Sequence, residues 1–198
     1  ILNNGQSCIS AKRIIVTKNN IKSFTKKLID KLDLKVMGDP NDDVDYGPLV
    51  SLSARTEVHK MVESSIKMGA KLNLGGKIPD SDGAYYPITV LSKVQPGMPA
   101  FDEEIFGPVF SIIEAIDNDH AIDLANNSKY GLGAAVFTSD INKGRKLVEE
   151  KIHAGVCFVN DYVKSDPRLP FGGVKMSGYG RELSGYGLME FVNIKSIV

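Results

Sequence analysis

The residue best suited to covalent chemistry is Cys8, which ends the run Asn-Gly-Gln-Ser-Cys at residues 4–8. Small residues follow it, and a basic and β-branched run occupies residues 12–16, so we predict that the thiol opens a short helix that leads into a strand. The orphan N–H groups at a helix N-terminus favour a thiolate and can stabilise an oxyanion formed at the sulfur. Most cysteines are small buried hydrophobes, so the run by itself allows either a nucleophile or a core residue.

Cys157 is the second cysteine and lies in the apolar run at residues 155–160. No charged or helix-terminal feature beside it would ionise its thiol, so we predict that it serves packing. Two cysteines cannot form a disulfide framework, and neither stands at metal-ligand spacing from a histidine. The sequence therefore predicts no metal site and a reducing compartment, with a cytoplasmic location.

Two later motifs accompany the cysteine run, in order along the chain. Residues 103–109 read Glu-Glu-Ile-Phe-Gly-Pro-Val, and residues 170–178 read Pro-Phe-Gly-Gly-Val-Lys-Met-Ser-Gly. The three motifs resemble the active-site signature, the cofactor-ribose motif and the late glycine-rich segment of the aldehyde dehydrogenase superfamily. The resemblance therefore runs from one end of the chain to the other. Within this family, residues 169–171 and 177–184 most resemble enzymes that act on succinate semialdehyde.

The resemblance implies a mechanism. Oxidising an aldehyde needs an added nucleophile, because the carbonyl carbon has no hydroxyl group that could lose a proton. Cys8 would form a thiohemiacetal, which passes hydride to NAD or NADP and leaves a thioester for water to hydrolyse. The backbone N–H of Cys8 would be an oxyanion donor. By resemblance, Glu104 would bind the hydroxyls of the nicotinamide ribose, Phe106 would lie near the nicotinamide, and Phe171 would wall the aldehyde pocket.

The loop before the glycine-rich segment offers groups for a substrate that carries a carboxylate. These groups are Ser165 and Arg168, and the arginine could grip a carboxylate in bidentate fashion. One branch of succinate semialdehyde dehydrogenases has an arginine six positions before the nucleophile, where this chain has Leu2, so the chain departs from that branch. Asn160 ends the last apolar run, and we expect it either to support the thiol indirectly or to serve packing or a turn.

Helical and extended patterns alternate along the chain. Such alternation favours a parallel sheet with helices on its faces. We therefore predict an α/β fold with a mostly parallel open sheet covered by helices, the type that the family resemblance also implies. The expected helices cover residues 21–34, 51–68, 119–126 and 141–152, and the expected strands cover residues 14–16, 71–74, 85–94, 109–115, 134–137 and 155–160.

We predict one catalytic domain over residues 1–185, followed by a C-terminal oligomerisation segment at residues 186–198. Residues 191–198 alternate apolar and polar side chains over most of their length, which favours an edge strand that a second copy can pair with. The sequence also starts without an initiator methionine and enters the cysteine run at once. We therefore expect a fragment. By resemblance, the N-terminal cofactor-binding domain, the general-base glutamate and an oxyanion-hole asparagine would lie upstream.

The charge balance excludes several classes of partner. The sequence has 24 Lys and Arg against 24 Asp and Glu, so no basic field is available for nucleic acid or an anionic membrane. No apolar run approaches the roughly 20 residues that a membrane span needs. The expected partners are therefore a small-molecule aldehyde and further copies of the chain.

Two other functions remain open on the sequence alone. A cysteine hydrolase or acyltransferase would use Cys8 with His59, His120 or His153 as its base. A non-catalytic α/β interaction module would have an inert Cys8 and would act through its edge strand. Replacing the three histidines would separate the dehydrogenase from the hydrolase, because only the hydrolase needs a histidine.

Overall fold

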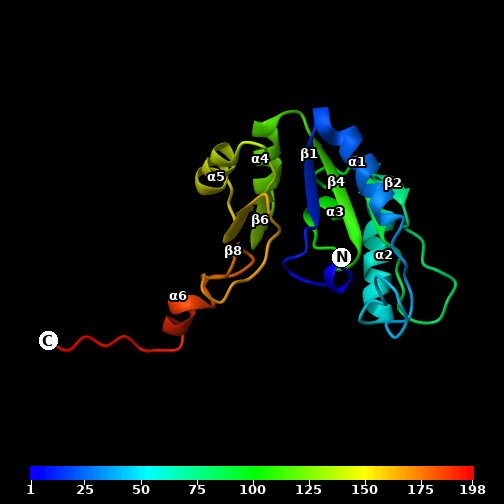
Figure 1. Ribbon diagram of the computed structural model, residues 1–198. Helices are drawn as coiled ribbons and strands as arrows, with labels where there is room; N and C mark the ends of the chain where they lie inside the picture. The colour runs from blue at the N-terminus through cyan, green and yellow to red at the C-terminus, as the bar shows by residue number, and fades with distance from the viewer. The chain divides into compact units, whose positions relative to one another are not determined.

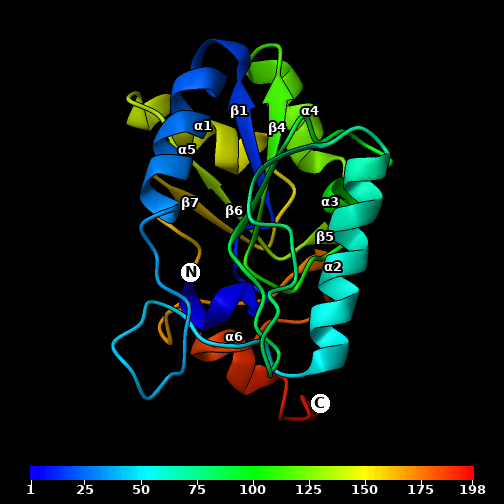
Figure 2. The ribbon, with the colours of Figure 1, turned by 90° about the vertical axis from the view of Figure 1, so that its right-hand side faces the viewer.

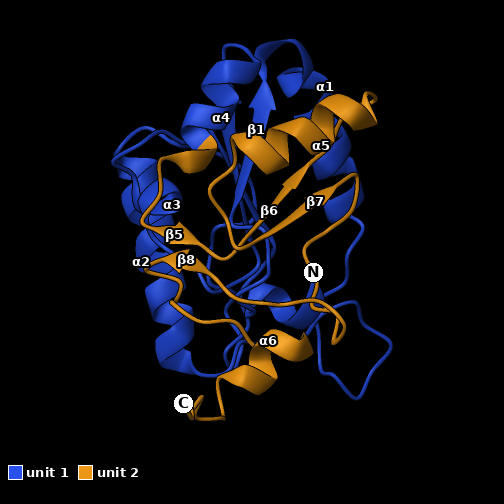
Figure 3. Ribbon diagram, turned by 90° about the vertical axis from the view of Figure 1, so that its left-hand side faces the viewer, with its two compact units in different colours: residues 1–124 blue, residues 125–198 orange.

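A computed structural model describes residues 1–198, which divide into two compact units. The first unit covers Ile1–Leu124 and the second covers Ala125–Val198 (Figure 3). The sequence predicts one domain over residues 1–185, so the division after Leu124 is a feature that the sequence pattern does not indicate.

The first unit contains most of the long elements. They are η1 (Leu2–Gly5), β1 (Arg13–Thr17), α1 (Lys18–Leu32), α2 (Leu52–Lys67), β2 (Lys71–Leu74), β3 (Thr89–Ser92), α3 (Pro99–Asp102), β4 (Val109–Ala115) and α4 (Asn118–Asn126), within which the division falls. The second unit contains β5 (Tyr130–Gly131), β6 (Gly133–Val136), α5 (Ile141–Glu150), β7 (Val156–Val159), β8 (Val174–Lys175) and α6 (Ser184–Met189).

The main sheet of the first unit has the strand order β1-β4-β3-β2. Strand β4 runs parallel to β1, which lies beside it in Figure 1. It also runs parallel to β3, whereas β2 is antiparallel to β3. In the second unit, β6 and β7 pair in parallel, and β5 pairs with β8 in antiparallel fashion. The predicted α/β class with mainly parallel strands is therefore confirmed.

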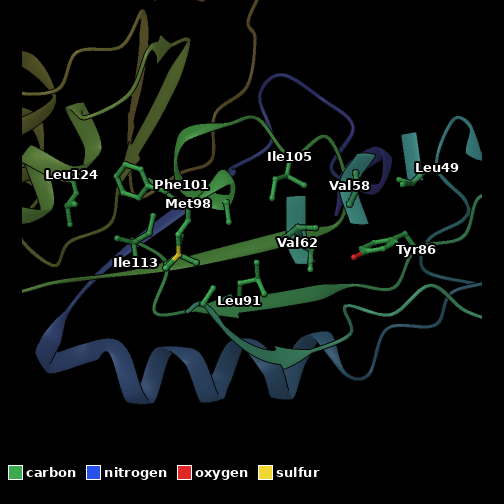
Figure 4. Packing of buried hydrophobic residues seen from close by; sticks show 14 of the residues in the cluster. Leu49, Val58, Val62, Tyr86, Leu91, Met98, Phe101, Ile105, Ile113 and Leu124 are labelled. Atoms are coloured by element: carbon green, nitrogen blue, oxygen red, sulfur yellow. The ribbon is translucent and has the colours of Figure 1, made fainter. Parts of the chain in front are cut away.

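Helices cover both faces of the main sheet, which explains why β4 reads as an almost continuous apolar run. Successive side chains of a strand point to opposite faces. Ile112 is fully buried in the cluster that includes Leu28 of α1, and Ile113 is buried in the cluster that includes Val62 of α2. The two helices lie on opposite sides of the strands in Figure 2, and Figure 4 shows the α2 side of this packing.

Local sequence signals fix the ends of several elements. The side chain of Ser51 accepts a hydrogen bond from the backbone N–H of Ala54 at 3.1 Å, so Ser51 caps α2. Pro87 stands before the ladder of β3, which begins at Thr89, so its missing N–H removes no ladder hydrogen bond. No helix of the structure has the length and apolar character needed to cross a bilayer.

The C-terminal residues are not paired as a strand within the single chain. Helix α6 ends at Met189, and residues 191–198 form no strand in the single chain. Phe191, Ile194 and Ile197 are largely exposed. The predicted edge strand at residues 191–198 is therefore not formed here, because an extended segment becomes a strand only when a partner satisfies its backbone groups. Sequence patterns also missed α3, β5, β8 and α6, which have two to six residues each.

Candidate active site

The cysteine motif forms a left-handed turn followed by an ordinary turn. Asn3, Asn4 and Gly5 have φ values of 50°, 54° and 74°, a conformation that asparagine and glycine tolerate best. Cys8 follows within a turn in which the backbone N–H of Ser10 donates to the carbonyl oxygen of Ser7 at 3.1 Å. The predicted helix start at Cys8 is therefore wrong, because the helical turn η1 ends before the cysteine. The exposed thiol of Cys8 therefore does not lie at a helix terminus.

Two side chains of the motif tie this turn to the loop that leads into α2. The Asn4 amide nitrogen donates to the carbonyl oxygens of Gly47 and Pro48 at 3.1 and 2.7 Å. The side-chain oxygen of Gln6 accepts from the backbone N–H of Val50 at 2.9 Å. These amides explain two polar residues of the motif: they position the main chain that carries the thiol.

The cysteine motif also lies directly against residues 104–108. A Cβ atom built on Gly5 would lie 2.2 Å from the carbonyl oxygen of Gly107, so only glycine permits this approach of two backbones. Gly107 in turn packs against Val58 of α2, whose methyl group would lie 2.9 Å from a Cβ there. The structure thus brings together two motifs that are about one hundred residues apart in the sequence.

The sheet explains why these motifs meet. The cysteine motif precedes β1, and residues 104–108 precede β4. Because β1 and β4 are adjacent and parallel, with Arg13 opposite Ser111, the segments that enter them lie at the same edge of the sheet. The site therefore lies where these two strands begin.

Lys12 joins the predicted residues of this edge, and sequence reasoning missed it. Its ammonium donates a hydrogen bond to the carbonyl oxygen of Gly5 and lies 4.8 Å from the centroid of the Phe106 ring. Burial lowers the pKa of Lys12, while the negative charges of Glu104 and Cys8 act in the opposite direction. The Lys12 ammonium therefore contacts the ring of Phe106 and interacts electrostatically with Cys8 and Glu104.

Glu104 and Phe106 present the groups that a nicotinamide nucleoside would need. The Glu104 side chain is half-buried, and the Phe106 ring is 42% exposed although Ile105 between them is only 3% exposed. A carboxylate can accept two hydroxyl hydrogen bonds, and an open aromatic face can pack against a planar ring. This pair fits the end of NAD or NADP that carries the nicotinamide.

The other cysteine has a different environment. Cys157 lies in β7 and is half-buried, with its sulfur 4.0 Å from the carbonyl oxygen of Ala154. Burial raises the pKa of its thiol. These features agree with the prediction that Cys157 serves packing.

The histidines of the first unit have hydrogen-bond partners other than the thiol. His59 Nδ1 lies 3.3 Å from the hydroxyl of Tyr86, and His120 Nδ1 accepts from the backbone N–H of Ile116 at 3.1 Å. A cysteine hydrolase needs its histidine within hydrogen-bond reach of the sulfur. These two contacts therefore weigh against the hydrolase alternative for His59 and His120.

The remaining predicted residues belong to the second unit. Phe171 is 9% exposed and exchanges two backbone hydrogen bonds with Glu182, at 2.8 and 2.7 Å. Ser165 lies exposed in the preceding loop. Arg168 is exposed there too, and its guanidinium binds the Asp166 carboxylate through two contacts of 2.9 and 2.6 Å. The fork predicted for a substrate carboxylate is thus occupied by a carboxylate of the same loop.

Asn160 has a structural role that its position after β7 explains. Its φ is 56°, and its side-chain amide accepts from the N–H of Thr138 and donates to the carbonyl oxygen of Thr138, both at 2.8 Å. The amide therefore extends the pairing of β6 and β7 by one step beyond the ladder. The sequence predicts that Asn160 supports the thiol indirectly or serves packing or a turn, and these hydrogen bonds correspond to the turn.

Comparison with known proteins agrees with these motifs. The model of the aldehyde dehydrogenase family matches residues 1–197. The chain is 44% identical over 196 residues to the succinate semialdehyde dehydrogenase [NAD(P)+] Sad of Escherichia coli, covering 98% of this chain and 42% of that protein. It is also 44% identical to succinate-semialdehyde dehydrogenase [NADP(+)] 1 of Mycobacterium bovis, covering 100% of this chain and 43% of that protein.

Solved structures give the same result. The crystal structure of succinic semialdehyde dehydrogenase from Streptococcus pyogenes, in complex with NADP+, superposes with a TM-score of 0.92 at 37% identity. The match covers 96% of this chain and 42% of that one. The chain therefore spans about two fifths of the length of the relatives that it matches.

Proposed function

Because the chain belongs to the aldehyde dehydrogenase family, we propose that it supplies the thiol and the nicotinamide-side contacts for NAD(P)-dependent oxidation of an aldehyde. The observation that carries this proposal is the packing of Gly5 against Gly107. This packing puts the thiol-bearing turn beside Glu104 and Phe106, which is the juxtaposition that the reaction requires.

In the proposed reaction, the Cys8 thiolate adds to the aldehyde carbon and converts a planar carbonyl into a tetrahedral thiohemiacetal. The backbone N–H of Cys8 would donate a hydrogen bond to the developing oxyanion. Glu104 would hold the ribose hydroxyls, and Phe106 would limit the position of the nicotinamide. NAD or NADP, when bound, accepts the hydride. The thioester that remains on Cys8 is then hydrolysed.

We propose succinate semialdehyde as the aldehyde. The proposal is supported by the similarity of the chain to the succinate semialdehyde dehydrogenases of Escherichia coli and Mycobacterium bovis. We propose that Ser165 and Arg168 bind the carboxylate of the substrate. We propose that Phe171 forms the apolar wall of the aldehyde pocket. Because Arg168 is bound to Asp166, the substrate carboxylate would have to replace that partner. An Asp166→Asn variant should therefore change KM for succinate semialdehyde more than KM for an uncharged aldehyde of similar length.

A test of the cofactor role uses Glu104→Gln in the protein that carries this chain. Loss of the charge weakens the grip on two hydroxyl groups, so the first turnover of nicotinamide reduction should slow more than thioester hydrolysis does. Glu114→Gln is the matched control, since Glu114 is exposed on β4. Unchanged rates of the reduction burst in the Glu104 variant would contradict its role.

We also propose that residues 191–198 pair with a second copy of the chain. Support comes from their alternating pattern and from the exposure of Phe191, Ile194 and Ile197. Deleting these residues should shift the mass measured by light scattering towards the monomer. An unchanged mass would show that the segment is not an interface.

A further inference from the structure

Lys12 stands four residues after Cys8, immediately before β1. Its side chain is half-buried, and a half-buried ammonium loses hydration that its surroundings must replace. Two neighbouring groups replace the lost hydration of the Lys12 ammonium, and both interactions require a cation. The carbonyl oxygen of Gly5 accepts a hydrogen bond from it, and the face of Phe106 lies 4.8 Å away. An apolar side chain of the same length could make neither interaction.

These two contacts join segments that are separate in the sequence. Gly5 belongs to the turn that carries the thiol, whereas Phe106 belongs to the segment assigned to the cofactor. Packing of Gly5 on Gly107 brings the segments together, but a backbone contact does not fix an aromatic ring. The ammonium contact restrains the ring, because a cation above its face favours one ring orientation.

The charge of Lys12 has a second consequence. In the proposed reaction the Cys8 thiolate and the Glu104 carboxylate are both anionic, and two like charges in one site disfavour each other's ionised form. Both groups interact electrostatically with Lys12. A positive charge next to both groups offsets this repulsion.

We propose that Lys12 is a positioning residue that couples the cysteine turn to residues 104–108 and supplies the positive charge shared by Cys8 and Glu104. The inference deepens the proposed function and rests on it for the reaction, but the effect on the thiol can be measured without any turnover. The proposed role also explains why residue 12, which only connects the cysteine turn to β1, is a lysine.

The test measures the alkylation rate of Cys8 by iodoacetamide at pH 7.5 and low salt, with peptide mass mapping and Cys157 as the internal reference. Lys12→Met keeps the length of the side chain and removes its charge, and Lys12→Arg keeps the charge. Lys27→Met makes the same charge change at an exposed position of α1. These variants are made in the protein that carries this chain, and their thermal unfolding is compared with that of the wild type.

We expect Lys12→Met to slow the alkylation of Cys8 by about two- to five-fold, as the loss of one nearby charge in a partly solvated site implies. The Cys157 rate should not change. Lys12→Arg and Lys27→Met should stay close to the wild-type rate. In the wild type, about 0.5 M salt should slow Cys8 but not Cys157, because salt screens the attraction to a half-exposed cation. This salt test remains available if Lys12→Met does not fold.

Wild-type alkylation of Cys8 in Lys12→Met, or an equal loss in Lys12→Arg, would overturn the proposal, because the charge of Lys12 would then have no effect. In the wild type, a Cys8 rate that does not respond to salt would overturn it as well. Failure of the proposed function looks different. The wild-type protein would then reduce no NAD or NADP with any aldehyde, while Lys12→Met still slowed the alkylation of Cys8.

Discussion

Replacing Gly5 with alanine tests whether the cysteine turn and residues 104–108 form one packed unit. The new Cβ would lie 2.2 Å from the carbonyl oxygen of Gly107 and 2.8 Å from its carbonyl carbon. Both atoms belong to the main chain, so no side-chain rotation can relieve the clash. The turn that carries Cys8 must therefore withdraw from residues 104–108.

The loss of stability has two parts. Gly5 has a φ of +74°, and a left-handed conformation costs alanine about 1–2 kcal/mol. Overpacking against a rigid neighbour adds about 1–3 kcal/mol. The free energy of unfolding should therefore fall by about 2–5 kcal/mol, which for a chain of this size lowers Tm by roughly 4–20 °C.

Gly97→Ala is the matched control for this experiment. Gly97 has a φ of +94°, and no atom lies within 4 Å of the Cβ that alanine would add. It therefore carries the backbone cost without the clash, about 1–2 kcal/mol. Thermal unfolding followed by circular dichroism compares the two variants. If Gly5→Ala and Gly97→Ala lower Tm equally, the close approach of the two motifs contributes nothing and the reasoning is refuted.

Three further predictions concern the thiols, a buried phenol and a helix cap. Brief iodoacetamide treatment should label Cys8 before Cys157, because Cys8 is exposed and burial raises the pKa of Cys157; mass mapping that finds Cys157 labelled first would contradict this. Burial raises the pKa of Tyr86 from 10.0 to about 12, so the folded chain keeps a proton that the unfolded chain loses. The free energy of unfolding should therefore fall by up to roughly 2.7 kcal/mol as the pH rises from about 10 to about 12. Urea titrations of Tyr86→Phe over the same pH interval should show a smaller fall. Ser51→Ala should cost about 1 kcal/mol through loss of the α2 cap, and an unchanged urea midpoint would show that the cap contributes nothing.

Elements with strong local signals could be predicted from the sequence. Helix α2 has a serine cap, one apolar face and Gly69 after its last turn, and its observed bounds differ from the prediction by one residue at each end. Strand β4 is apolar because it is buried on both faces, and its predicted bounds agree with the structure. In these segments, local propensity and tertiary burial favour the same conformation.

The cysteine turn was mispredicted although its sequence contains a usable signal. Asn-Asn-Gly at residues 3–5 combines the residue types that best tolerate left-handed backbone. Small residues around a thiol are also typical of a helix start, which is why the pattern alone does not separate the two. The edge strand at residues 191–198 stays a prediction, because such a strand forms only when a partner satisfies its backbone groups, and a single chain contains no second copy.

Lys12 could not have been identified from the sequence, because its partners come from two segments that only the sheet brings together. Once β1 and β4 are known to be parallel neighbours, the residues that precede both strands must share an edge. That edge is where β1 and β4 begin, whereas ligands of open parallel sheets usually bind at the carboxyl ends of the strands. The thiol and the proposed cofactor contacts are therefore carried by loops that enter the strands, and close backbone packing at Gly5 and Gly107 positions them in place of a helix N-terminus. In the proposed site, Gly5 and Gly107 would therefore be as necessary as Cys8 and Glu104.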